Sequence, residues 1–179
     1  VCCPRRSQPC WRWMRLIASR AGSYPHEVEQ ADRTMTELLH IVCPHCHTTN
    51  RVAAEHLASA PDCGKCHQPL FTGHPLALDA ASFERHIGRS QVPVLVDFWA
   101  PWCGPCRMMA PAFEHAAGLL EPHVRLAKVN TEDEQQLAAR FNIRSIPTLA
   151  LFVNGREVAR QAGAFPSAQD IVGWVRSHL

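Results

Sequence analysis

The chain has 179 residues, of which 46% are apolar and 19% are charged, and its formal net charge at pH 7 is +2. This length predicts one or two small domains. The near balance of charge argues against the strongly basic surface of a nucleic-acid-binding protein. No apolar segment approaches the roughly 20 residues that a membrane-spanning helix needs. We therefore expect neither a nucleic acid nor a membrane as a partner.

The cysteine content is high, because the chain has nine cysteines and six of them form three C-x-x-C pairs. Pairs at such short range are typical of metal sites or redox chemistry, and not of a secreted disulfide framework. The apolar stretch at residues 16–18 is too short for a secretory signal, and Arg20 follows it closely. The expected compartment is the reducing cytoplasm.

Residues 1–34 contain six arginines against three acidic residues. An Arg-rich, acid-poor opening can resemble a transit peptide, but a disordered or misassigned extension is the favoured interpretation. Met35 is expected to be the true start. No role is assigned to the first three cysteines, which are Cys2, Cys3 and Cys10.

Two of the cysteine pairs predict a zinc site in residues 35–73. Sixteen residues separate the first pair from the second, which matches the spacing C-x2-C-x15–20-C-x2-C. Each pair offers two thiolates, and four thiolates complete a tetrahedral zinc shell. A segment this short cannot build a large core, so a bound metal is expected to stabilise its fold. The expected ligands are Cys43, Cys46, Cys63 and Cys66.

The sequence Cys43-Pro44-His45-Cys46 taken alone resembles the active site of periplasmic disulfide oxidases. No buried strand with an aromatic end precedes it, and Thr48-Thr49-Asn50 is a poor start for a helix. Zinc is therefore favoured over a redox role for this pair. The three neighbouring histidines are expected outside the metal shell: His45, His47 and His67.

The remaining residues, 74–179, predict alternating strands and helices. Apolar runs indicate strands at 94–99, 124–129 and 148–153, and Asn154-Gly155 predicts a hairpin that returns at 157–162. Helices are expected after the caps Asp79 and Ser167, from Cys103 to about Leu120, and after a capping box at 131–134. The order β-α-β-α-β-α-β-β-α predicts an α/β fold with a mixed sheet and helices on both faces.

The third cysteine pair, Cys103 and Cys106, lies where the buried strand at 94–99 turns into a helix. The first turn of a helix carries free N–H groups and a partial positive charge, which stabilise a thiolate. Cys103 should therefore be the nucleophile, and Cys106 is close enough for a disulfide. Pro105 suits an early helical position. A structural or metal-binding role for this pair is the less favoured alternative.

The motif Trp99-Ala100-Pro101-Trp102-Cys103-Gly104-Pro105-Cys106 resembles the active site of the thioredoxin family at all eight positions. The resemblance extends over residues 75–179 and implies the thioredoxin fold. The preceding cysteine-rich segment is similar to the N-terminal zinc module of the bacterial thioredoxins often called thioredoxin 2. The expected organisation is therefore an extension at 1–34, a zinc ribbon at 35–73 and a thioredoxin domain at 74–179.

Asp97 stands in a run expected to be buried, and a lone buried carboxylate is costly. Burial disfavours its charge, which makes it a competent proton acceptor near neutral pH. The resemblance implies that it deprotonates Cys106, although a structural acid is the alternative. Lys128 matches the family's buried lysine and is expected to neutralise Asp97, with a plain surface lysine as the alternative.

The resemblance also implies a substrate surface around the thiolate. Pro147 is expected to be cis and to lie against the cysteine pair, while the backbone of Ile146 pairs with an extended substrate. Trp102, Gly163 and Ala164 match the apolar surface that surrounds the thiolate in this family. Trp99 is expected to pack under the active site. Gly104 and Pro105 support it between the cysteines.

These residues imply a protein-disulfide reductase that forms a mixed disulfide through Cys103 and resolves it through Cys106. No G-x-G-x-x-G motif follows a strand, so a separate reductase is expected, which in this family is the NADPH-dependent thioredoxin reductase. A monomer is expected. The alternatives are a zinc-dependent redox sensor or chaperone-like binding protein on a thioredoxin platform, and an oxidase or isomerase.

Overall fold

The structure is a computed structural model that describes residues 37–179. The interpretation of residues 1–34 as an extension lies outside these residues. All the described residues belong to one compact unit, Met35–Leu179. No helix in this part of the chain is long and apolar enough to cross a membrane.

The cysteine-rich segment forms a two-stranded antiparallel hairpin followed by a short 3-10 helix. Two tight turns, each carrying one C-x-x-C pair, lie after the first strand and after the helix. A small core forms between them from Ile41, Leu57 and Leu70, and Val92 of the following domain is part of it. The elements are β1 (Leu38–Val42), β2 (Thr49–Ala53) and η1 (Ala54–Ser59).

The rest of the chain folds into a five-stranded mixed sheet in the order β3-β5-β4-β6-β7. Strand β5 runs parallel to β3 and β4, whereas β6 is antiparallel to both β4 and β7. The strands are β3 (Leu76–Ala77), β4 (Val94–Trp99), β5 (Arg125–Asn130), β6 (Thr148–Val153) and β7 (Arg156–Ala162). The helices are α1 (Ala80–Arg89), α2 (Gly104–Leu120), α3 (Gln135–Arg140) and α4 (Ala168–Arg176).

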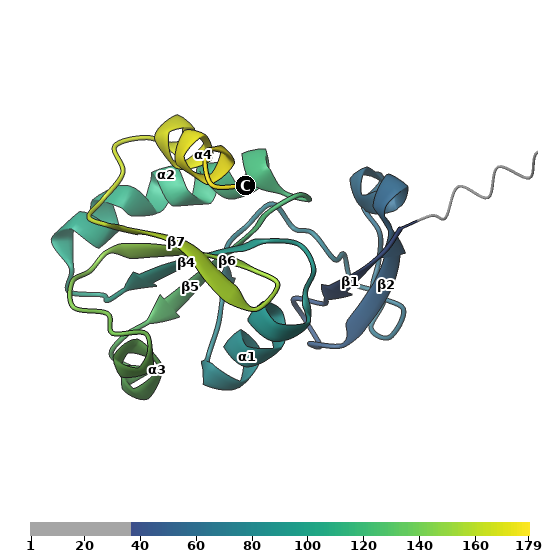
Figure 1. Ribbon diagram of the computed structural model, residues 1–179, viewed down its shortest axis with the longest axis horizontal. Coiled ribbons are helices and arrows are strands. Elements are labelled where there is room, and N and C mark those ends of the chain that lie inside the picture. The colour runs from purple at the N-terminus through teal and green to yellow at the C-terminus, as the bar shows by residue number, and fades with distance from the viewer. Residues whose placement is uncertain (1–36) are drawn as a thin grey trace, which may run out of the picture. The chain divides into compact units, whose positions relative to one another are not determined.

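Helices cover both faces of this sheet (Figure 1). One face packs against α2 and α4 through Leu95, Phe113 and Ile171. The other packs against α1 and α3, and its centre is an aromatic cluster in which Phe83 lies 5.6 Å from Phe152 and 5.2 Å from Phe141 between ring centroids. Strand β4 is central, with five of its six residues buried. It therefore provides a rigid support for the loop that follows Trp99 and leads into α2.

Local sequence signals explain most of the helix boundaries. Asp79 caps α1 in a capping box with Ser82, and the Ser167 side chain caps α4. Asn154 and Gly155 both have positive φ, 49° and 80°, as a tight hairpin between β6 and β7 requires. The predicted element order from β3 to α4 is confirmed.

The capping box predicted at residues 131–134 is wrong. The Thr131 hydroxyl donates to the Trp99 carbonyl at 3.1 Å, and the Asn130 side chain accepts the Glu132 N–H. These bonds hold residues 131–133 in a turn, so α3 begins at Gln135 with Glu134 as an N-cap that makes no side-chain bond.

Candidate functional site

The third cysteine pair sits at the junction between β4 and α2, as the sequence predicts. Cys103 is the N-cap of α2, and its Sγ accepts the N–H of Cys106 at 3.1 Å. The two cysteines are joined as a disulfide, with Cα atoms 5.3 Å apart. Pro105 occupies the first turn of α2. Free N–H groups at the start of a helix stabilise a thiolate placed there.

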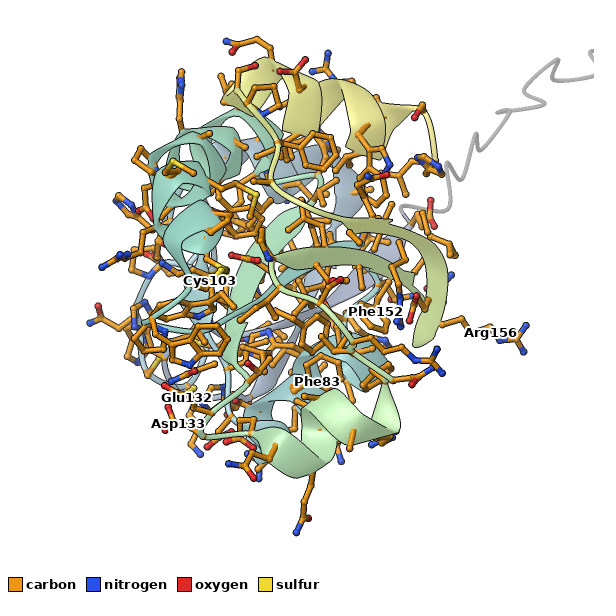
Figure 2. All side chains as sticks on the ribbon, turned by 90° about the vertical axis from the view of Figure 1, so that its left-hand side faces the viewer. Phe83, Cys103, Glu132, Asp133, Phe152 and Arg156 are labelled. Carbon is orange, nitrogen blue, oxygen red and sulfur yellow. A yellow bond between two sulfur atoms is a disulfide. The ribbon has the colours of Figure 1, made fainter. Side chains whose placement is uncertain are left out.

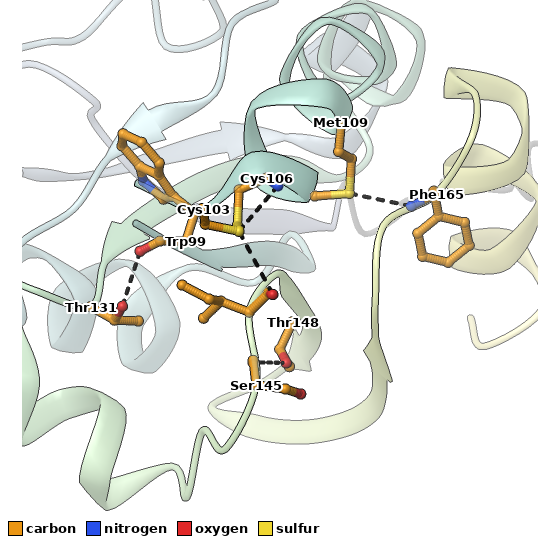
Figure 3. The surroundings of a disulfide bond; sticks show 9 residues. Trp99, Cys103, Cys106, Met109, Thr131, Ser145, Thr148 and Phe165 are labelled. Carbon is orange, nitrogen blue, oxygen red and sulfur yellow. Dashed lines mark hydrogen bonds between the residues drawn. A yellow bond between two sulfur atoms is a disulfide. The ribbon is translucent and has the colours of Figure 1, made fainter. Parts of the chain in front are cut away.

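A second loop faces Cys103 from the start of β6 (Figure 3). The Ile146–Pro147 peptide bond is cis, as the resemblance implies. Cys103 Sγ lies 3.7 Å from the carbonyl oxygen of Ile146. Gly163, at the end of β7 with φ of 94°, donates its N–H to the Pro147 carbonyl at 2.9 Å. These segments, distant in sequence, therefore meet at the disulfide.

Apolar side chains surround the disulfide, some supporting it and others open to solvent. Trp99 and Ile146 pack against the small core formed by Ala100, Cys103 and Cys106. Trp102 is 66% exposed and Met108, two residues past Cys106, is 75% exposed. Ala164 is exposed as well. Exposed apolar groups gathered beside a reactive pair are typical of an interaction surface. Figure 2 labels Cys103 to the left of Phe83 and Phe152, where α2 begins.

Met108, an exposed apolar residue of α2, was not among the site residues predicted from the sequence. The signal that could have found it is its position on α2. Met109, the next residue, is buried, and its sulfur accepts the Phe165 N–H at 3.4 Å (Figure 3). Because successive residues of a helix point about 100° apart, a buried Met109 turns Met108 outward.

Asp97 lies on β4 with its side chain buried, and it is only 3% exposed. Burial raises the pKa of this carboxyl from 3.8 to about 7, although the positive charge of Lys128 opposes the shift. Lys128 is half-buried and stands opposite Asp97 in the β4–β5 register. Lys128 and Trp99 are among the residues that line a cleft of about 550 Å³, whereas Asp97 does not line it. A carboxyl with such a pKa can accept a proton near neutral pH.

The four cysteines of the first two pairs converge. Their Sγ atoms all lie within 4.8 Å of one another, and two distances between the pairs, Cys43–Cys66 and Cys46–Cys63, are 3.6 Å. Zinc–sulfur bonds of about 2.3 Å in a tetrahedron put the sulfurs roughly 3.8 Å apart. This set of four thiols therefore fits a zinc ion.

The two turns that carry these cysteines repeat the same geometry. In each turn the first sulfur accepts a backbone N–H at 3.4 Å, from His45 in one and Lys65 in the other. The residue after each pair, His47 or His67, has positive φ and donates its N–H to the first cysteine's carbonyl. N–H groups aimed at sulfur stabilise thiolates, which are the form that binds zinc.

The thiols of this cluster differ in pKa. Burial raises the pKa of Cys43 to about 12. Burial also acts to raise the pKa of Cys63. Hydrogen bonds from the N–H groups of Cys66 and Lys65 and from the Asn50 amide outweigh this effect and lower the pKa to about 6. These donors favour the thiolate form of Cys63, which is the form that binds zinc.

The histidines beside the cluster are not part of the group of possible ligands in the described residues. His45 and His67 are exposed. His47 Nδ1 instead lies 3.3 Å from Nε2 of His86, a fully buried residue of α1. Their rings meet edge to face with centroids 5.5 Å apart. The cysteine-rich segment therefore contacts the larger domain through this pair.

A disulfide at a helix start, beside a cis-proline on a mixed α/β sheet, defines a thiol–disulfide oxidoreductase. The family profile described as Thioredoxin matches residues 74–177, and the zinc-ribbon profile described as Thioredoxin 2, N-terminal, matches residues 42–68. The chain belongs to the thioredoxin family and carries an N-terminal four-cysteine zinc ribbon.

Individual relatives agree with this assignment. Thioredoxin C-3 of Corynebacterium nephridii is 50% identical over 139 residues, which cover 78% of this chain and 94% of the relative. Thioredoxin of Haemophilus influenzae is 43% identical over 104 residues, covering 58% of this chain and 96% of the relative. The crystal structure of Malassezia sympodialis thioredoxin (Mala s 13) matches with a TM-score of 0.54 at 29% identity, covering 60% of this chain and 92% of that one.

Proposed function

We propose that this thioredoxin works as a protein-disulfide reductase in which Cys103 attacks and Cys106 resolves. The observation that carries the proposal is the Cys103–Cys106 disulfide at the start of α2, next to cis-Pro147. Cys103 is favoured as the attacking residue because it is the N-cap and its sulfur already accepts an N–H from the helix.

The reduced pair reacts in two exchange steps. The Cys103 thiolate attacks one sulfur of a substrate disulfide, whose S–S bond breaks, and the other substrate sulfur leaves as a thiolate. The Cys106 thiolate then attacks Cys103 Sγ, the mixed disulfide breaks, and the second substrate thiolate leaves. Substrate gains two electrons, and the Cys103–Cys106 disulfide forms.

Asp97 is proposed as the base that takes the proton from Cys106 before the second step. Its pKa of about 7 means that it is partly ionised and can accept a proton at neutral pH. Lys128, opposite Asp97 in the register, would stabilise the carboxylate after the proton leaves.

The substrate is proposed to bind across the surface that surrounds Cys103. An extended peptide would pair with the backbone at Ile146, next to cis-Pro147, and its side chains would contact Trp102, Gly163 and Ala164. Trp99, Gly104 and Pro105 would support the turn that carries Cys103 and Cys106. The partners are proteins that carry reducible disulfides, which the thioredoxin family implies.

We further propose that the oxidised pair is reduced by a separate NADPH-dependent thioredoxin reductase. The proposal is supported by the lack of a G-x-G-x-x-G motif after a strand in this sequence. A monomer in a reducing compartment, the cytoplasm, is the proposed state, because zinc-binding cysteines must stay reduced. Residues 35–73 and 74–179 are proposed as the two functional domains.

The test is reduction of insulin by dithiothreitol, followed by turbidity. Wild type should accelerate it, Cys103→Ser should not, and Cys106→Ser should accumulate mixed disulfides through Cys103 that mass spectrometry detects. Normal turnover by Cys106→Ser would show that the two roles are misassigned. Failure of the intact dithiol form to accelerate reduction would favour the redox-sensor alternative.

A further inference from the structure

Arg125, the first residue of β5, is a fully buried arginine outside the redox site. A buried guanidinium is costly unless its donors are satisfied. Its two terminal nitrogens donate to backbone carbonyls of the zinc ribbon, NH1 to Val42 and NH2 to Leu70. Its Nε lies 3.6 Å from Oε1 of Glu121, and the two side chains are 1% and 5% exposed.

The two carbonyls belong to opposite halves of the metal cluster. Val42 directly precedes Cys43 in the first cysteine turn. Leu70 follows the second cysteine turn, and its N–H donates to the Pro61 carbonyl at 2.9 Å, which closes the loop that contains Cys63. One planar guanidinium of the thioredoxin domain therefore holds the flanks of both cysteine pairs.

The ribbon has its own link between the two halves. Asn50 on β2 accepts the Gly64 N–H at 2.9 Å, and its amide lies 3.5 Å from Cys63 Sγ. Arg125 belongs to the other domain. Its guanidinium also lies over the ring of Phe71, with Cζ 5.0 Å from the ring centroid, and so contacts the segment after the second cysteine turn.

We propose that Arg125 is a positioning residue of the zinc site: by bonding Val42 and Leu70 at once, it keeps the two cysteine pairs at metal-binding distance and couples zinc affinity to docking of the ribbon on the thioredoxin domain. Coupling between binding and docking is reciprocal. Zinc binding must therefore favour docking of the ribbon by the same free energy by which docking favours zinc binding.

Other contacts between ribbon and domain provide a matched control. The Gln91 side chain accepts the His40 N–H at 2.6 Å, and the Gln91 N–H donates to the His40 carbonyl at 2.8 Å. These bonds reach only β1 and not the second cysteine turn. Gln91→Ala therefore weakens docking on one side and leaves the link between the halves intact.

The substitutions at Arg125 must not leave Glu121 as an unpaired buried charge. Arg125→Met combined with Glu121→Gln keeps the volume and removes both charges, and the glutamine oxygen can still accept the Gly73 N–H that Glu121 accepts at 2.6 Å. Arg125→Lys keeps the positive charge, but a lysine cannot reproduce the fork of two parallel donors.

The experiment measures zinc affinity of the full-length reduced protein by competition with a chromogenic chelator, together with thermal unfolding with and without zinc. The double variant should lose roughly tenfold or more in zinc affinity, as positioning groups of metal sites do. Arg125→Lys should lose affinity too, whereas Gln91→Ala should stay within about twofold of wild type. Chelation should lower the unfolding temperature of wild type more than that of the double variant.

A folded double variant with wild-type zinc affinity would overturn the proposal, and would leave Arg125 as an ion pair that only stabilises the fold. An equal loss of affinity in Gln91→Ala would also overturn it, because docking alone would then account for the effect. Should the double variant not fold, Arg125→Lys decides: a wild-type zinc affinity in that variant overturns the proposal.

Discussion

Asp97 on β4 and Lys128 on β5 face each other in the parallel register of the two strands, and the carboxylate oxygen Oδ1 of Asp97 has no hydrogen-bond partner among residues 37–179. A charged carboxylate in such a site loses its hydration without recovering it from neighbouring donors. The pKa of Asp97 therefore reports a cost to folding as well as a capacity to accept a proton.

The first prediction is that Asp97→Asn stabilises the oxidised protein at alkaline pH. The pKa of Asp97 rises from 3.8 to about 7 on burial, so between these values the folded state keeps a proton that the unfolded state has lost. Stability of the wild type thus falls as pH rises from about 4 to 7. At pH 8 the variant should be more stable by on the order of a few kcal/mol, measured by denaturant unfolding.

The control for this prediction is Glu132→Gln, which removes one exposed carboxylate in the turn before α3 (Figure 2). It should leave the pH dependence unchanged. At pH 4 the stabilities of wild type and Asp97→Asn should converge, because the wild-type carboxyl is protonated when folded. A stability difference that stays constant from pH 4 to pH 8 would contradict an elevated pKa.

The second prediction concerns the resolving step. Asp97→Asn should slow release of the mixed disulfide by Cys106, most strongly near neutral pH, where a base is needed and thiolate is scarce. Stopped-flow kinetics with a disulfide peptide, from pH 6 to pH 9, separate attack from release. Equal release rates across pH 6–8 would assign Asp97 a structural role only.

How far the sequence predicts this molecule depends on the range of the interactions concerned. Strand β4 and strand β6 match their predicted bounds, because five consecutive buried positions leave a clear apolar signal. The convergence of the four cysteines was predictable from spacing alone. Each of these features follows from a short stretch of chain.

Features that depend on docking had no such signal. Arg125 appears in the sequence as an ordinary charged residue at the start of a strand, yet it is fully buried because Val42 and Leu70 supply its acceptors. His86 is likewise fully buried, because the docked ribbon places His47 against it. The turn before α3 was mispredicted because Thr131 bonds Trp99, which is distant in sequence. Contacts between distant segments decide each of these cases.

The third prediction tests the proposed substrate surface. Trp102→Ala should lower kcat/KM for a protein disulfide on the order of tenfold, because exposed tryptophans at interfaces often contribute strongly to binding. Reduction of a small disulfide that does not reach Trp102 should change little. Leu119→Ala, which removes an apolar side chain that is 46% exposed near the other end of α2, serves as the control. Equal losses in both variants would argue against a surface centred on Trp102.

The fourth prediction is that the protein purified under reducing conditions contains about one zinc per chain and releases it on mild peroxide treatment. Cys46 and Cys66 are half-buried, so an oxidant can reach them, and oxidised sulfurs no longer bind zinc. Metal analysis and a zinc-sensitive dye measure content and release. Zinc-free protein from a reducing preparation would contradict a four-cysteine zinc site.

The last prediction is that residues 74–179 alone fold and reduce disulfides. They contain all five strands of the sheet, helices α1–α4 and the Cys103–Cys106 pair. Removal of the ribbon takes away both carbonyl acceptors of Arg125 and the histidine partner of His86, and exposes these buried side chains. The shortened protein should therefore unfold several degrees below the zinc-loaded full chain while its insulin reduction stays within a few-fold. Circular dichroism melting and the turbidity assay measure the two quantities. A correctly folded but inactive fragment would show that the ribbon takes part in the reaction, and an unchanged melting temperature would show that its contacts with Arg125 and His86 contribute nothing to stability.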